Sequence, residues 1–535
     1  MSRDDAAAYD RHKADVDGAL LEPGHKPFAE LYAKLVPCGA AYSVETGWTT
    51  CDARCVWVAH GSGVVPPALR RSVGDVLRAH FRAAQQAAER GAGDGAAALL
   101  RASAKAVAAV NSAPYLSGVV MMLQDQLLDE GLHARLNAQP HLLAFTDAVV
   151  DLDTRDVRAI APGDYVSVTT GYPYPTVPDA DADARVRAFL RSMFEDDRDV
   201  ACLLRYLAAQ LHGSKPHELF YIWKGPPRAG KGALAALLAR ALGGYAGTWQ
   251  VRMLTTRKSA PEGAEPALLA ARYARVMVTT EPEPRVGGGG GGGSDAALQT
   301  GFVKQLVGRD PILCRAMYSG AMVSLTPGFG LIIQTNGVLT YNAVDPALTC
   351  KQRIVPFKFT FVDAPTAPDE RKRDNGVKSA CAGDPAWRDA FVRLLLAKWF
   401  DEVAGAATLA QSPAFAAATR AYAVEADPVE AWLADSYVVD AGRVGDRATW
   451  KSTEELHSDF RAATGCELGV QAWAARMKEL GVPKSANAVR LGGAQARYWL
   501  GLVVVDAVAA CGVEGSDGGT GGGGGGGYGG GGGCA

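Results

Sequence analysis

The chain of 535 residues lacks a long hydrophobic run. No stretch of about 18 apolar residues occurs, which is the length a membrane-spanning helix requires. The apolar segment that begins at Trp499 is interrupted by Asp506. The first 19 residues are polar and lack the apolar core of a secretory signal. The sequence therefore predicts a soluble, intracellular protein that does not associate with a membrane.

The ten cysteines show no paired framework of the kind that staples secreted domains. Cys38, Cys51, Cys55 and His60 form a candidate zinc set, but the wide first gap and the three-residue spacer differ from paired CxxC knuckles. We favour free thiols in a reducing compartment. The net charge is only −2, so the chain is no polycation, and any nucleic-acid contact must come from local basic surface.

Shifts in composition divide the chain into six segments. Alanine-rich helical periodicity, short β-type runs, a Pro- and charge-rich stretch and two glycine tracts supply the boundaries. The predicted segments are 1–65, a possible remnant of a zinc module; 66–217, helical and mixed; 218–365, a nucleotide domain; 366–426, a helical connector; 427–510, a small C-terminal domain; and 511–535, a glycine-rich tail. We expect the tail and the glycines at 287–293 to be mobile.

A phosphate-binding loop is predicted between a β-type run and an apolar-periodic helix. Loop amides and a lysine converge on nucleotide phosphates in such a unit, at the positive end of the helix. The residues of the loop are Gly225, Pro226, Pro227, Arg228, Ala229, Gly230, Lys231 and Gly232. The bland alternative is a chance glycine turn before a helix, and the strand–loop–lysine–helix order argues against it.

Gly232 is a departure from the full motif GxxxxGK[ST]. The hydroxyl that follows the lysine in that motif holds Mg²⁺, and Ala233 does not supply one either. Either water replaces this ligand or turnover is weakened.

An acidic strand follows about 50 residues later. ARVMVTTEPE reads as a buried parallel strand that ends in Glu281 and Glu283. An acid at this strand end can hold Mg²⁺ or its water and polarise an attacking water, so Glu281 is the predicted catalytic acid and metal ligand, with Glu283 in reserve. An ordinary strand end with solvated glutamates is the alternative.

A third apolar run, FGLIIQTN, ends in Asn336, whose amide can orient the attacking water or contact the γ-phosphate. Thr335 is the substitute. Arg353 precedes a further β-type run, from which an arginine at a subunit edge can reach a neighbouring nucleotide site. A turn asparagine and a surface arginine are the plain alternatives, which the order of the motifs disfavours.

A basic segment lies between the acidic strand and Asn336. This segment contains the basic residues Lys304, Arg309 and Arg315 and the single acid Asp310. Two β-type pieces around 319–321 predict a hairpin. Such a hairpin can line a channel and grip a phosphate backbone. A structural hairpin with solvated charges is equally consistent with the pattern.

In this order, the phosphate loop, TTEPEP, FVKQLVGRDPILCR, LIIQTN and QRIVPF resemble a superfamily 3 helicase, and most closely the poxvirus-type primase-helicase family of large DNA viruses, phages and plasmids. The resemblance implies an α/β fold with an AAA+-like P-loop NTPase core, a helical and mixed N-terminal region and a small winged-helix-like C-terminal domain. It implies ATP and Mg²⁺ as cofactors and a homo-hexameric ring on single-stranded and forked DNA. Lys231 would bind phosphate, Glu281 would serve Mg²⁺ and water activation, Asn336 would be the sensor, and Arg353 would act in trans.

The family often carries a primase domain ahead of the motor, and roughly 60 residues before the helical region cannot house one. We expect separate primase and polymerase partners, in the host nucleus or cytoplasm if the protein is viral. In the C-terminal segment, basic residues that face the single acid Glu479 form a candidate DNA surface or a solvated helix face: Arg476, Lys478, Lys484, Arg490 and Arg497.

Two other functions stay open. Because Gly232 lacks a hydroxyl, the chain could bind ATP, hydrolyse it weakly, and serve as a ring component or loader. A small-molecule kinase uses the same loop, but it would lack the basic segment and the arginine in trans.

Overall fold

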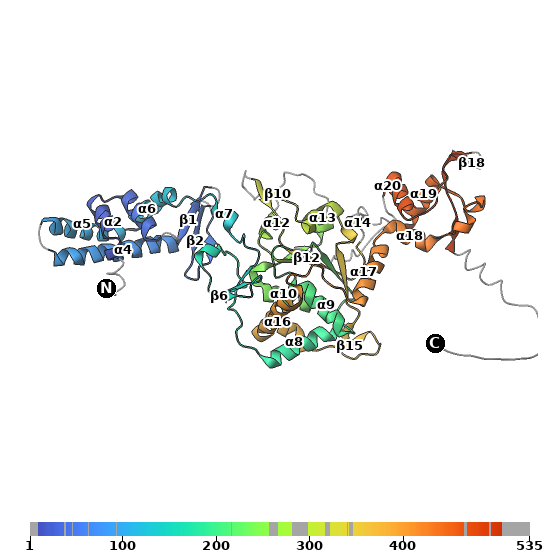
Figure 1. Ribbon diagram of the computed structural model, residues 1–535, viewed down its shortest axis with the longest axis horizontal. Helices are drawn as coiled ribbons and strands as arrows, with labels where there is room; N and C mark the ends of the chain where they lie inside the picture. Colours follow the sequence, from blue (N-terminus) through green and yellow to red (C-terminus); the bar gives the residue numbers. More distant parts are fainter. Residues whose placement is uncertain are drawn as a thin grey trace, which may run out of the picture.

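The computed structural model describes most of the chain between residues 9 and 505 (Figure 1). The described residues are 9–36, 39–44, 47–61, 64–91, 94–215, 217–255, 266–280, 298–315, 322–339, 341, 346–464, 468–491 and 494–505. The predicted tail, the glycines at 287–293, and Glu281 and Glu283 lie outside them.

A five-stranded parallel sheet is the centre of the molecule. It consists of β7 (Phe220–Lys224), β8 (Ala246–Gln250), β9 (Val276–Thr280), β12 (Gly330–Thr335) and β13 (Gln352–Pro356), in the order β13-β7-β12-β9-β8. The runs that the sequence marks before the phosphate loop, before Glu281 and before Asn336 become β7, β9 and β12. Because all five strands are parallel, the three runs end at the same edge of the sheet.

Helices cover one face of this sheet. They are α8 (Ala180–Ser192), α9 (Asp197–Ala208), α10 (Lys231–Leu242) and α16 (Pro385–Lys398), and one hydrophobic core joins them to the strands (Figure 1). This core contains residues on both sides of the predicted boundaries at 217 and 365. The helices before and after the predicted nucleotide domain therefore complete its packing.

The opposite face of the sheet carries a second core. It packs against α12 (Pro266–Ala270), α13 (Thr300–Gly308) and α17 (Pro413–Glu425). Side chains of β12 alternate between the cores, with Ile332 in the first and Leu331 and Ile333 in the second. The hairpin predicted around 319–321 is present as β10 (Ile312–Arg315) and β11 (Met322–Leu325), an antiparallel pair.

The N-terminal part is a helical unit with a small sheet. Its elements are α2 (Lys13–Leu21), α3 (His25–Leu35), β1 (Ala40–Ser43), β2 (Gly47–Cys51), β3 (Trp57–Ala59), α4 (Pro67–Arg90), α5 (Asp94–Val110) and α6 (Ala113–Gln126). One core takes side chains from both sides of residue 65, including Phe28 and Phe81. Among the described residues no single helix is long and apolar enough to span a membrane; α5 and α6 pass that test only as a pair, which is bent by 94°.

A three-stranded sheet connects this unit to the centre. It contains β4 (Leu142–Ala144), β5 (Val149–Asp151) and β6 (Val157–Arg158), joined antiparallel. The segment that follows, residues 165–172, is irregular. Its backbone bonds are single contacts with other elements, such as Thr170 N–H to the Ala144 carbonyl at 2.9 Å, and these do not form a ladder.

The C-terminal part is a compact unit at the far end from the N-terminal helices (Figure 1). Its helices are α18 (Pro428–Ser436), α19 (Thr453–Thr464) and α20 (Val470–Glu479), and it contains the hairpin of β18 (Val489–Leu491) and β19 (Ala494–Ala496). Two further antiparallel pairs join β16 (Tyr437–Val439) to β21 (Leu502–Val504) and β17 (Lys451–Ser452) to β20 (Tyr498–Trp499). Trp432, Phe460, Trp473 and Trp499 form its core.

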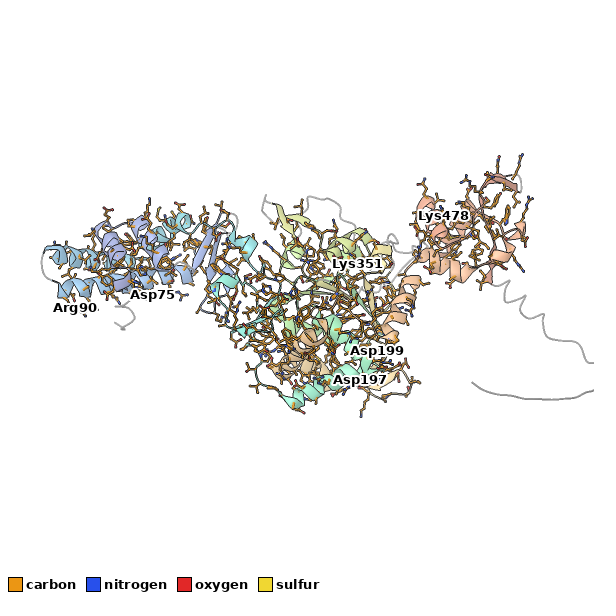
Figure 2. All side chains as sticks on the ribbon, in the orientation of Figure 1. Asp75, Arg90, Asp197, Asp199, Lys351 and Lys478 are labelled. Carbon is orange, nitrogen blue, oxygen red and sulfur yellow. The ribbon has the colours of Figure 1, made fainter. Side chains whose placement is uncertain are left out.

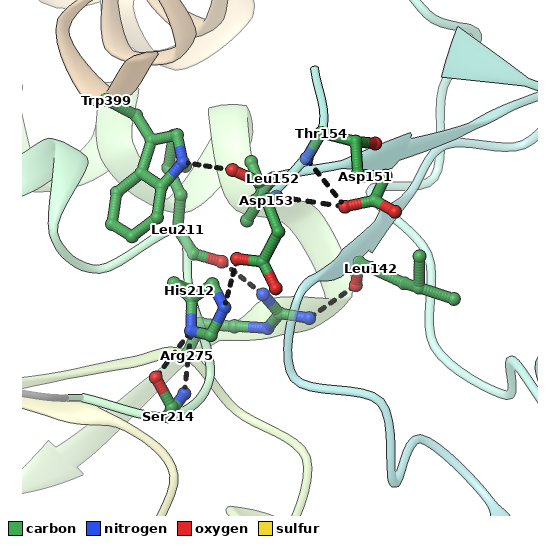
Figure 3. Close-up of polar contacts among 10 residues, drawn as sticks. All are labelled: Leu142, Asp151, Leu152, Asp153, Thr154, Leu211, His212, Ser214, Arg275 and Trp399. Carbon is green, nitrogen blue, oxygen red and sulfur yellow. Dashed lines mark hydrogen bonds and ion pairs between the residues drawn. The ribbon is translucent and has the colours of Figure 1, made fainter. Parts of the chain in front are cut away.

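Polar contacts fix the β4–β6 sheet to the N-terminal edge of the parallel sheet (Figure 3). Arg275, next to the start of β9, donates to the backbone carbonyls of Leu142 and Leu211 and is buried. His212 stacks on Trp399, with ring centroids 5.3 Å apart. Its Nδ1 accepts the Ser214 N–H at 3.1 Å, so its Nε2 carries the proton and donates to an Asp153 oxygen 3.3 Å away.

We expect this junction to weaken in mild acid. Burial and the charge of Arg275 lower the pKa of His212 from 6.5 to about 4, so the unfolded chain binds a proton between these values and the folded chain does not. The stability that neutral His212 contributes is complete above pH 6.5 and is lost as the pH falls toward 4, up to about 3 kcal/mol. Urea unfolding at several pH values will show a steeper loss for the native chain than for His212→Gln; parallel slopes would contradict the assignment.

Gly243 packs closely against the Thr170 backbone in the same region. It ends α10 at φ +52°, and a Cβ there would collide with the Thr170 backbone. Gly243→Ala should lower the free energy of unfolding by about 2 kcal/mol or more, because the added methyl group meets both backbone strain and a rigid neighbour. Gly383→Ala, at the end of α15 (Asn375–Gly383) with open space around it, is the control and should change little in the same urea titration.

Candidate functional site

The loop after β7 has the backbone shape that a phosphate loop requires. Gly225 donates its N–H to the Thr335 carbonyl at 3.2 Å, and a Cβ on Gly225 would collide with the backbone of Phe357. Gly230 has φ +86° and caps α10. A Cβ there would also lie 3.1 Å from the Met193 sulfur. Both glycines are needed because the chain approaches its neighbours too closely for a side chain.

Lys231 lies at the centre of the site. Its ammonium donates to the carbonyls of Gly225 and Pro226 at 2.5 and 3.2 Å, and to the Asn336 side-chain oxygen at 2.6 Å. The lysine is only 3% exposed. Residues 105 positions apart in the chain, which the sequence singles out separately, are thus in direct contact. Thr335, the substitute for Asn336, instead donates its hydroxyl to the Gly337 carbonyl at 2.9 Å.

A cavity of about 820 Å³ opens at the N-terminus of α10. Six cations and one acid line it: Arg185, Arg228, Lys231, Lys372, Arg373, Lys378 and Asp374. Phe189, Phe361 and Trp387 form apolar wall. The cavity therefore combines an excess of positive charge with aromatic surface, which suits a ligand that carries both an anion and a flat ring.

Sequence reasoning missed four of these cations. Arg185 comes from α8, and Lys372, Arg373 and Lys378 come from the segment that the sequence assigns to a connector. Arg373 is held by Asp363 at 2.9 Å, and Arg185 lies over the Trp387 ring. The run ERKRD at 370–374 was the available signal. In the sequence this run is indistinguishable from the charged residues of a linker. Only folding brings it to the same cavity as Lys231.

The predicted acid Glu281 lies outside the described residues. The strand before it, β9, ends at Thr280, and β9 pairs in parallel with β12, which ends beside Asn336. Parallel pairing brings the two strand ends to one edge, as the sequence predicts for the acidic and sensor motifs. The role of Glu281 stays a prediction.

Arg353 lies away from the cavity of its own chain. It is the second residue of β13, paired with Tyr221, whereas the phosphate loop begins four residues beyond that pair. At about 3.3 Å per residue this amounts to roughly 13 Å along the sheet. Its guanidinium donates to the carbonyls of Cys350 and Gln352, both at 2.7 Å. Because β13 is an edge strand, Arg353 sits on the border of the sheet.

The three cations predicted to bind nucleic acid do not form one group. Lys304 is exposed on α13, while the side chain of Arg315 lies outside the part of the chain that the structure describes. Arg309 ends α13 with φ +61°, and its charge helps to lower the pKa of the buried Lys215. Arg309 therefore faces the packed N-terminal edge of the sheet. Of the three, Lys304 is the cation whose side chain the structure shows exposed on a helix.

The C-terminal basic residues also separate into two groups. Lys478, Lys484, Arg490 and Arg497 are exposed, and Figure 2 shows Lys478 on the outside of the C-terminal unit. Arg476 was wrongly grouped with them. Its guanidinium contacts Asp427 at 2.6 Å, Glu479 at 2.9 Å and Glu430 at 3.3 Å. Asp427, the N-cap of α18, and Glu430 lie outside the stretch of sequence in which Glu479 is the single acid. Their ion pairs with Arg476 join α18 to α20.

The structure describes three of the four candidate zinc ligands. Cys51 and Cys55 form no disulfide with any cysteine that the structure describes, and His60 Nε2 lies 2.8 Å from the Thr50 hydroxyl. Within the described part of the chain no group of three or more His, Cys, Asp or Glu is placed to hold a metal ion. Cys38 lies outside that part.

Comparison with known proteins gives one family match and several viral relatives. Residues 28–195 match the family described as D5 N terminal like. "Putative helicase L207/L206" of Acanthamoeba polyphaga mimivirus is 26% identical over 304 residues, which is 55% of this chain and 30% of that protein. "Putative helicase 022R" of Frog virus 3 is 29% identical over 194 residues, 35% of this chain and 19% of that protein. The chain thus spans less than a third of the curated relatives it matches.

Among solved structures, the NrS-1 C-terminal region is similar at a TM-score of 0.41 and 10% identity, covering 88% of this chain and 98% of that one. The JCV helicase is similar at a TM-score of 0.28 and 14% identity, covering 65% of this chain and 87% of that one. Likenesses this distant add nothing to the argument. The chain is thus similar over residues 28–195 to the D5 N terminal like family, and over part of its length to four viral proteins described as putative helicases.

Proposed function

We propose that this chain is an ATP-dependent DNA helicase of viral or mobile-element replication. One observation carries the proposal: the Lys231 ammonium contacts both the phosphate loop and Asn336, inside a cavity with six cations and one acid. A nucleoside triphosphate brings four negative charges and a flat base. The cations and the aromatic wall of this cavity match these two features.

Within this site the residues divide the work by position. The loop amides and Lys231 hold the phosphates at the positive end of α10, while Asn336 orients the attacking water. Arg373, Lys372 and Lys378 add positive charge from the far wall, next to Trp387. Glu281, at the end of β9, is the proposed general base.

The residues around the loop also fit a divalent cation. Mg²⁺ prefers oxygen ligands and keeps several of its waters, and Gln334, near this end of β12, has an amide oxygen and lines the cavity. With nucleotide bound, the cation neutralises charge on the β- and γ-phosphates. Glu281 is the proposed acidic ligand.

We assign the sheet and its loop to the AAA+-like P-loop class and propose a homo-hexameric ring. Support comes from Arg353, which lies on the border strand and roughly 13 Å from the loop of its own chain, by the rise of a strand. In a ring this position lets Arg353 reach the nucleotide of a neighbour. ATP hydrolysis would then depend on contact between neighbouring subunits.

DNA contact is proposed at two places. Lys304 and the β10–β11 hairpin, with Arg315, would face single-stranded DNA in the channel. The C-terminal unit, at 427–510, has three helices and a two-stranded hairpin, and we interpret it as winged-helix-like. The motor is proposed to act at a fork with separate primase and polymerase chains.

A second function has one observation in its favour. Gly232 provides no hydroxyl, so the chain could bind ATP and turn it over slowly as a ring component or loader. The surroundings of Gly232 make this testable, because a Cβ there meets no heavy atom within 4 Å.

Lys231→Ala tests the nucleotide site. Loss of the ammonium should weaken binding of a nonhydrolysable ATP analogue by at least about tenfold and hydrolysis by about 100-fold, because a preorganised cation is lost from the phosphates. Lys224→Ala is the matched control. Lys224 ends β7, the strand that leads into the phosphate loop, but pairs with Glu425 at 2.7 Å and does not line the cavity, so both measurements should stay near native values. Unchanged binding in Lys231→Ala would refute the proposed site.

Gly232→Ser distinguishes the two functions. For a helicase, native ATPase activity should be steady and should rise several-fold with single-stranded DNA, while the serine variant gains less than about tenfold. For a weakly hydrolysing loader, native turnover should be near background and Gly232→Ser should raise it strongly. ATPase rates with and without single-stranded DNA provide the measurement.

A further inference from the structure

Gln334 is an unexpected residue in its strand. β12 reads GLIIQT, every residue of it is buried, and Gln334 is only 9% exposed. It shares a strand face with Ile332, whose side chain packs in the core beneath α10. A polar amide at this depth needs a partner, because burying it without one is unfavourable.

The side chain of Gln334 finds no such partner within the described part of the chain. None of the hydrogen bonds formed there involves its amide, whereas the buried amide of Gln210 donates to the Tyr206 carbonyl at 2.7 Å. Gln334 instead lines the 820 Å³ cavity together with Lys231 and Gly232. Its amide therefore borders the cavity without a protein partner among the described residues.

Gly232 leaves room at the same place. It is the second residue of α10, it lines the cavity, and nothing lies within 4 Å of the position where its Cβ would be. In the full motif a serine or threonine at this position points an oxygen toward the cation that accompanies the nucleotide. The chain thus lacks one oxygen on α10 and has one unsatisfied amide oxygen on the strand beneath it.

We propose that the side-chain oxygen of Gln334 replaces the missing hydroxyl and joins the coordination shell of the divalent cation bound with the nucleotide. This inference rests on the proposed function, because it assumes that the cavity binds a nucleoside triphosphate. A neutral amide oxygen is a hard donor suited to Mg²⁺, and the cation's retained waters span the space left at residue 232. Gln334 is then a binding residue for the cation, and Gly232 no longer implies a disabled site.

The experiment measures binding and needs no turnover. The Kd of a nonhydrolysable ATP analogue is determined by calorimetry in Mg²⁺ and in EDTA, and the ratio of the two values reports the contribution of the cation. Gln334→Leu, close to the original in volume, should reduce this ratio by about tenfold or more while leaving the Kd in EDTA unchanged, as expected for loss of one ligand of a metal site. The unchanged EDTA value also shows that the variant is folded.

Gly232→Ser supplies the rescue. Adding the serine to Gln334→Leu should restore most of the Mg²⁺-dependent gain, whereas the serine in the native background should add little. Gln250→Leu is the matched control, because Gln250 ends β8 at the border of the same sheet and is exposed. It should leave both Kd values at the native level.

Three results would overturn the inference: an unchanged Mg²⁺/EDTA ratio in Gln334→Leu, an equal loss of affinity in Mg²⁺ and EDTA, or no rescue by Gly232→Ser. Failure of the proposed function looks different. In that case the native chain binds no nucleotide in Mg²⁺ or in EDTA, or it binds nucleotide no more tightly than Lys231→Ala does. A native chain that needs Lys231 but not Gln334 would refute only the role of Gln334.

Discussion

The contact between the Lys231 ammonium and the Asn336 amide is the interaction on which the rest of the site depends. A buried ammonium must be surrounded by oxygens, and here they are the loop carbonyls of Gly225 and Pro226 and the Asn336 side chain. These three acceptors are neutral. A phosphate offers the ammonium a charged acceptor, and charge-assisted hydrogen bonds are stronger than those to neutral oxygens.

The parallel sheet makes this contact possible. Parallel pairing of β7 and β12 brings the start of the phosphate loop and Asn336 to one edge, although 105 residues separate Lys231 from Asn336. Helices from outside the predicted nucleotide segment complete the same unit, since α8 and α16 contribute Arg185 and Trp387 to the cavity wall. The functional unit is therefore larger than the segment that carries the motifs.

Contacts at the opposite edge connect the sheet to its neighbours. Arg275 and His212 join the β4–β6 sheet to the region before β7 and β9, while Arg476 joins the helices of the C-terminal unit. The two arginines and the neutral His212 satisfy backbone carbonyls and acids, so these contacts are structural. Their hydrogen bonds offset the cost of burying them.

The sequence by itself determined the strands and the loop, because their signals are local: apolar runs, glycines at fixed spacing, and a lysine before a helix. Lys231, Asn336 and the hairpin after Arg309 follow from such patterns. Only the tertiary structure decided which distant charges meet. It moved Arg476 into an ion-pair network, brought Arg185, Arg373 and Lys378 into the cavity, and left Gln334 unpaired beneath α10. These outcomes depend on packing between segments far apart in the chain, for which no local pattern exists.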